Sequence, residues 1–138
     1  MKHTFWTMVL IGFAFTSCHS LKKASSEETQ TVSTKAKAIP LTVKEEKVVA
    51  AKGEDSSVGN FKYYIIWGSF QHQENALKLK KQLIDEYQTQ AFILVNEEGW
   101  FRVCFESYNK EKSARARIQE LRDKYPNFET MWLLINKM

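Results

Sequence analysis

The stretches Tyr64-Ile65-Ile66-Trp67-Gly68-Ser69-Phe70 and Arg102-Val103-Cys104-Phe105-Glu106-Ser107-Tyr108 decide the fold, because the second repeats the first at a spacing of 38 residues (102 minus 64). Each stretch is rich in apolar residues and ends on serine and an aromatic residue, a pattern typical of a strand that runs into a turn. Apolar residues at helical spacing follow in both halves: Ala76, Leu83, Tyr87 and Ala114, Leu121, Tyr125. Each half therefore predicts a strand, a short turn and a helix.

A further apolar run follows each predicted helix, at residues 91–95 and 130–135. Residues 96–99 predict a hairpin turn into the next strand, which includes Trp100 and Arg102. Asn109 is the expected N-cap of the second helix, and Pro126 is expected to end it. The order strand, helix, strand, strand, helix, strand predicts an α+β, ferredoxin-like βαββαβ fold. We expect a four-stranded antiparallel sheet with both helices on one face and the other face open to solvent.

The 138 residues divide into three parts by composition. Residues 1–17 contain a short apolar run after Lys2 and predict a signal peptide, because eleven residues are too few to span a bilayer. Residues 18–60 contain no aromatic residue and are rich in Ser, Thr, Lys and Glu, which predicts a disordered tether. The folded domain is then expected at 61–138, a size that excludes a large multidomain enzyme.

Ser17-Cys18 at the end of the apolar run resembles the bacterial lipobox, although Phe15 stands where leucine is usual. The resemblance implies lipidation of Cys18, which would anchor the chain in one leaflet of a membrane. His19 stands where the inner-membrane retention signal has Asp, which favours the outer membrane and places the domain in the periplasm. An ordinary secretion signal with a chance cysteine is the alternative.

Strand alternation predicts which side chains reach the open face. Phe101, Val103 and Phe105 are uniformly apolar and should face the helices, so Trp100 and Arg102 should face outward. The repeat carries the same assignment to the first strand and predicts two more outward side chains, Tyr64 and Ile66. An indole beside a guanidinium can stack on the apolar face of a sugar and bind its polar groups. The alternative is that Trp100 caps the hairpin and Arg102 is solvated at a sheet edge.

These residues resemble a known family, the SPOR domain, a peptidoglycan-binding module of bacterial division and wall proteins. The resemblance rests on residues 64–70, Glu74-Asn75-Ala76 and Gly99-Trp100-Phe101-Arg102-Val103. It implies binding to glycan strands stripped of their stem peptides by amidases. The family's glycan-contacting positions fall in this chain on Ile66, Ser69, Trp100 and Arg102. Ile66 replaces a glutamine and Glu106 replaces a glycine of the family pattern, and the Ser69 hydroxyl has a second interpretation as a cap for the turn.

Catalysis is not expected. His72 lies in a turn, Cys104 has no evident base beside it, and the sequence shows no phosphate-binding glycine loop or metal-ligand spacing, so no cofactor is predicted. A net charge of +4 is too small to indicate a nucleic-acid partner. The predicted function is therefore glycan-strand binding by a lipid-anchored protein, with division proteins as possible partners. Two alternatives are a protein-interaction lipoprotein that uses the same face, and an RNA-binding domain if the leader is not cleaved.

Overall fold

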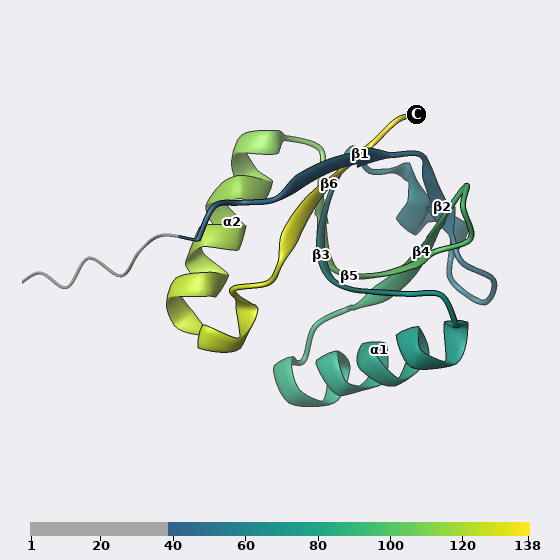
Figure 1. Cartoon of the computed structure of the whole chain (residues 1–138), viewed down its shortest axis with the longest axis horizontal. Coiled ribbons are helices and arrows are strands. Elements are labelled where there is room, and N and C mark those ends of the chain that lie inside the picture. The colour runs from purple at the N-terminus through teal and green to yellow at the C-terminus, as the bar shows by residue number, and fades with distance from the viewer. Residues whose placement is uncertain (1–38) are drawn as a thin grey trace, which may run out of the picture. The chain divides into compact units, whose positions relative to one another are not determined.

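The computed structural model describes residues 39–138 (Figure 1). The predicted signal peptide, Cys18 and the first part of the predicted tether lie outside the described residues. No helix within residues 39–138 is long and apolar enough to cross a membrane. The elements in chain order are β1 (Val43–Glu46), β2 (Val48–Ala50), the 3-10 helix η1 (Ser56–Asn60), β3 (Tyr63–Phe70), α1 (Gln73–Tyr87), β4 (Phe92–Asn96), β5 (Phe101–Tyr108), α2 (Glu111–Lys124), the 3-10 helix η2 (Pro126–Phe128) and β6 (Trp132–Asn136).

The four strands predicted from the repeat form the centre of the sheet in the order β6-β3-β5-β4, and all their pairings are antiparallel. Both long helices pack on one face of these strands, as the sequence predicts. The core on this face, called the helix-side core, includes Ile65 and Val103 from the central strands, Ala76 and Leu83 from α1, and Ala114, Ile118 and Leu121 from α2. The ferredoxin-like order of strands and helices is therefore present.

The 38-residue repeat is also visible in the structure. The bounds of β5 are those of β3 displaced by 38 residues, since 63 plus 38 is 101 and 70 plus 38 is 108. The second helix begins one residue later than predicted, with Lys110 rather than Asn109 as its N-cap, and no side chain there makes a capping hydrogen bond. Helix α2 ends at Lys124, and Pro126 stands at the start of η2, where its fixed φ is compatible with the first helical turn.

The sheet has six strands rather than the predicted four. Strand β1 pairs in parallel with β6 at one edge, and β2 pairs antiparallel with β4 at the other, so the sheet is mixed. Only Lys47 separates β1 from β2 in the chain. A single short segment therefore joins the two edges of the curled sheet, and Figure 1 shows β1 and β2 connecting β6 with β4.

The predictions of an open sheet face and of a disordered tether through residue 60 are wrong for the described residues. Residues 43–61, called the covering segment, lie across the face that the helices leave free. A second apolar core, called the sheet-side cluster, lies between this segment and the sheet, and the segment contributes Val48 to it: Val48, Tyr64, Ile66, Phe92, Leu94, Cys104 and Leu134. Val58 and Phe61 of the covering segment pack against this cluster. Without the segment, the apolar side chains on this face of the four central strands would contact water, and the free energy gained by burying them would be lost.

Buried asparagine and tyrosine side chains fasten the covering segment to the sheet. Asn136 is 2% exposed, its Oδ1 accepts from the backbone N of Val48 at 3.2 Å, and its Nδ2 donates to the carbonyl of Gly59 at 3.2 Å. The Tyr64 hydroxyl donates to the carbonyl of Val58 and accepts from the backbone N of Phe61, both at 3.0 Å. Burial raises the pKa of Tyr64 above its usual value. These bonds satisfy polar groups that would be costly to bury alone.

Candidate functional site

Two indoles flank a single guanidinium on the sheet face away from the helices. The guanidinium carbon of Arg102, on β5, lies 5.5 Å from the ring centroid of Trp100 and 5.5 Å from that of Trp132 on β6. We call these three residues the aromatic–arginine row. The predicted juxtaposition of Trp100 and Arg102 on one side of the sheet is present, and sequence reasoning missed Trp132 because both faces of its strand are apolar. Cation–π geometry of this kind holds a guanidinium in place.

Arg102 is not free, because Glu46 of β1 binds it with both carboxylate oxygens. Nε of Arg102 donates to Oε2 at 2.9 Å, and a terminal guanidinium nitrogen donates to Oε1 at 2.7 Å. The two side chains are 8% and 17% exposed, so this bidentate pair is largely removed from water. Asn96 donates from Nδ2 to the same carboxylate at 3.3 Å. The arrangement is a well-formed carboxylate-binding site that is occupied by a residue of the chain itself.

Strand β1 also covers the second indole. The ammonium of Lys44 lies 5.2 Å from the centroid of the Trp132 ring. Lys44 and Glu46 are two residues apart on one strand and therefore point to the same side of it. This side of β1 lies over the aromatic–arginine row.

The turn predicted at residues 96–99 positions Trp100. Asn96 accepts at Oδ1 from the backbone N of Glu98 at 3.1 Å and from that of Trp100 at 2.8 Å. Gly99 has a φ of +82°, a conformation that a side chain disfavours. The turn and strand β5 thus fix the indole next to Arg102.

Ser69 reaches the same face as Arg102 through a β-bulge. Strict alternation from Tyr64 and Ile66 would place residue 68 on this face, but the register between β3 and β5 skips Trp67. Ser69 consequently lies opposite Arg102 in the register, while Gly68 lies toward α1. The capping interpretation of Ser69 is not supported, because Ser69 is inside β3 and the N-cap of α1 is His72.

Two predicted ligand contacts are inaccessible. Tyr64 and Ile66 lie on the predicted face, but both are 0% exposed and belong to the sheet-side cluster. The expectation that they meet solvent is wrong because the covering segment buries them. The accessible part of the predicted site is reduced to the partly buried Trp100 and Ser69, with Arg102 enclosed beneath Glu46.

Comparison with known families supplies the remaining observation: the model of the SPOR domain family matches residues 59–129. The chain belongs to the SPOR domain family. This match confirms the resemblance noted in the sequence, and SPOR domains bind peptidoglycan. No curated protein and no solved structure matches the chain. The matched region begins within η1, so β1 and β2 precede it, and the covering of the SPOR domain face comes largely from outside the matched region.

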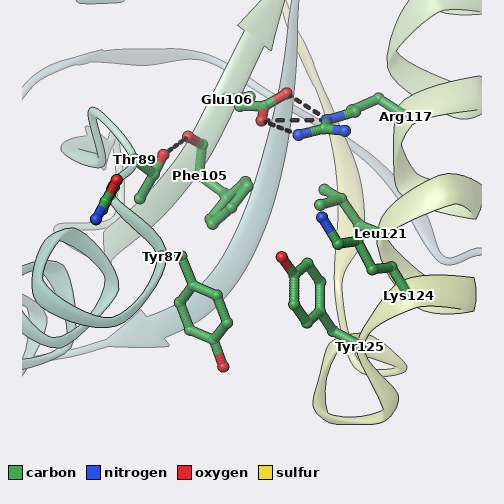
Figure 2. Close-up of a pocket in the computed structure, with 9 residues that line it drawn as sticks. Tyr87, Thr89, Phe105, Glu106, Arg117, Leu121, Lys124 and Tyr125 are labelled. Atoms are coloured by element: carbon green, nitrogen blue, oxygen red, sulfur yellow. Dashed lines mark hydrogen bonds and ion pairs between the residues drawn. The ribbon is translucent and has the colours of Figure 1, made fainter.

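A pocket of the SPOR domain lies between its two long helices, α1 and α2. Figure 2 shows this pocket, in which Tyr87 of α1 and Tyr125 after α2 lie near an ion pair of Glu106 with Arg117. A terminal nitrogen of Arg117 is 2.9 Å from Oε1 of Glu106, and burial together with Glu106 raises the pKa of Tyr108. Glu106, the departure from the family glycine, is therefore a partner of α2 and does not lie in a tight turn.

The possible nucleophile of the SPOR domain is enclosed. Cys104 is 0% exposed, and burial raises the pKa of its thiol well above the usual value. A buried thiol of this kind is an inert packing group. Within residues 39–138, no three His, Cys, Asp or Glu side chains are grouped as metal ligands.

Proposed function

We propose that this SPOR domain binds peptidoglycan glycan strands whose stem peptides have been removed, and that the aromatic–arginine row makes the contact. Family membership supports peptidoglycan as the partner. The observation that carries the proposal is the guanidinium of Arg102 held between Trp100 and Trp132 at 5.5 Å from each ring. Indole rings stack on the C–H faces of pyranose sugars, and a guanidinium binds the oxygen groups at their rims. Ser69, across from Arg102 in the register, adds a hydroxyl to the same face.

Sedimentation with sacculi tests this proposal. We expect the full chain, kept in mild detergent, to sediment with amidase-treated sacculi and to sediment much less with untreated ones. Trp100→Ala should abolish sedimentation, because it removes the accessible edge of the aromatic–arginine row, the partly buried indole of Trp100. Arg115→Gln is the matched control, since Arg115 is an exposed residue of α2 paired with Glu111 on the helix side. Equal sedimentation of Trp100→Ala and the unaltered chain would refute the assignment of the site.

We further propose that Cys18 carries a lipid that holds the protein in the cell envelope, in the outer membrane rather than the inner, with the domain in the periplasm and acting in cell division or wall remodelling. The apolar run that ends at Ser17-Cys18, and His19 after it, support this proposal. Cys18→Ala should move the protein from the membrane fraction to the soluble fraction. Unchanged membrane association of this variant would contradict a lipid anchor.

A partner protein on the same face is the outcome that would replace glycan binding. A photo-crosslinker introduced at position 100 distinguishes the two, because it should capture muramyl glycan. Capture of a wall-machinery protein without glycan would favour the protein-interaction alternative.

A further inference from the structure

We propose that Glu46 is an internal stand-in for a carboxylate on the ligand, so that the glycan binds Arg102 only when the end of β1 moves away. This inference rests on the function proposed above and goes beyond it in two respects. It names the ligand group that Arg102 recognises, and it makes β1 an intramolecular competitor for the site.

The site around Arg102 is shaped for a carboxylate. Both oxygens of Glu46 receive a guanidinium N–H, at 2.9 and 2.7 Å, and the Asn96 amide adds a third donor to Oε2 at 3.3 Å. The guanidinium is side-on to its partner and fixed between two indoles. A planar fork of this kind prefers a carboxylate to a neutral oxygen group, because each hydrogen bond is charge-assisted.

The glycan offers such a group only after its stem peptide is gone. Muramic acid joins the peptide through an amide on its lactyl side chain, and this amide is neutral. Hydrolysis by an amidase leaves a lactyl carboxylate in its place. A guanidinium flanked by sugar-stacking rings therefore distinguishes the peptide-free strand from the intact one by charge, in addition to any difference in size.

Strand β1 is the less buried part of the covering segment, and its pairing with β6 must break for it to leave. Residues 42–45 are exposed, and Val43 is 37% exposed although it is apolar. On the far side of Lys47 the segment is firmly held, because Val48 is 3% exposed and its backbone N donates to Asn136. The chain before β1 is attached by Leu41 against the helix-side core and by a bond from Arg122 to the carbonyl of Ile39. Movement of β1 thus uncovers Trp132 and Arg102 while the sheet-side cluster stays buried.

Two muramyl glycans that differ in one group test the choice of ligand. The first is the amidase-released oligosaccharide with free lactyl carboxylates, and the second is the same oligosaccharide with these carboxylates converted to primary amides. We expect the full chain to bind the carboxylate form about tenfold more tightly than the amide form, the size of one charge-assisted bidentate pair. The double variant Glu46→Gln/Arg102→Gln keeps a neutral hydrogen-bonded pair in the site, and it should bind both forms equally.

A single variant tests the competition. Glu46→Gln keeps the shape of the side chain and removes its charge, so it should release Arg102 and raise affinity for the carboxylate form about tenfold. Glu45→Gln is the matched control, because Glu45 is the exposed neighbour on the same strand and should change affinity little. Hydrogen exchange supplies a second measurement: the carboxylate glycan should deprotect amides of β1 and leave those of β2 protected.

Each result has one meaning. Equal binding of the two glycans, with Trp100→Ala still abolishing it, overturns the carboxylate assignment and leaves the proposed function intact. Unchanged affinity in Glu46→Gln, or β1 amides that stay protected in the complex, overturns the competition. If Glu46→Gln binds the glycan and the unaltered chain does not, the result supports the competition between Glu46 and the ligand. If neither the unaltered chain nor this variant binds any glycan, the proposed function is overturned as well.

Discussion

Replacement of Val48 by alanine should destabilise the domain, although Val48 lies in the part of the chain that its composition assigns to a tether. Val48 is 3% exposed within the sheet-side cluster, whereas its neighbour Val49 is 56% exposed on the outer side of β2. Val48→Ala removes the equivalent of two buried methylene groups, a loss of about 1.6 kcal/mol of transfer free energy. The cavity left behind raises the expected decrease in the free energy of unfolding to about 2–3 kcal/mol. Val49→Ala shares the change in strand propensity, below about 1 kcal/mol, and removes much less buried surface, because Val49 is 56% exposed.

Urea unfolding followed by tryptophan fluorescence measures both variants. The midpoint for Val48→Ala should fall clearly below that for Val49→Ala, with a similar dependence of the unfolding free energy on denaturant, because the same surface is exposed on unfolding. The difference between these adjacent positions isolates burial from propensity. Equal midpoints would refute the conclusion that the covering segment belongs to the folding unit.

Two further predictions concern pH and packing. Burial raises the pKa of Tyr64, Tyr108 and Cys104, while the same groups in the unfolded chain ionise near their ordinary values of about 10 for tyrosine and about 8.5 for cysteine. Unfolding therefore releases protons at alkaline pH, and the free energy of unfolding should be flat near neutrality and fall as the pH rises above about 9; stability that instead rises with pH there would contradict the burial of these groups. At Gly68, a Cβ would lie 2.5 Å from Cδ2 of Leu79, so Gly68→Ala should cost about 1–3 kcal/mol in thermal or urea unfolding. The same change in a Leu79→Ala background should cost less, and an equal cost in both backgrounds would show that the contact is not the cause.

The sequence was sufficient to predict the central strands and both helices. Because the same pattern occurs twice, each predicted strand and helix is supported by two separate stretches of sequence. The side-chain facing of β5 followed from one uniformly apolar set, and Val103 and Phe105 lie in the helix-side core as expected. The bulge was not predictable from alternation alone. The register skips Trp67 in β3 and Phe105 in β5, which are 38 residues apart, so the repeat extends to this irregularity.

The covering segment was missed because its apolar residues are few and separated. The run Val48-Val49-Ala50-Ala51 is too short to build a core, but it needs only to cover one that other strands supply. The available signal lay elsewhere in the chain. Residues 92–95 and 131–135 are apolar on both faces, a pattern typical of strands that are buried on both sides. Two such strands predict that something covers the second face, although they do not identify the segment.

The departure at Ile66 and the covering segment have one physical explanation. A glutamine at this position, as the family pattern has it, would contact a ligand only on an open face. Here position 66 is 0% exposed among Tyr64, Cys104 and Leu134, where an amide would be buried among apolar groups. Isoleucine suits a face that is covered by β2 and η1. Arg102 tolerates the same enclosure because Glu46 satisfies its guanidinium. The sheet face therefore has two parts. The part beneath β2 and η1, which includes Ile66, belongs to the core, whereas the aromatic–arginine row beneath β1 keeps the groups that bind a ligand. Lys47, between β1 and β2, marks the boundary between the two parts.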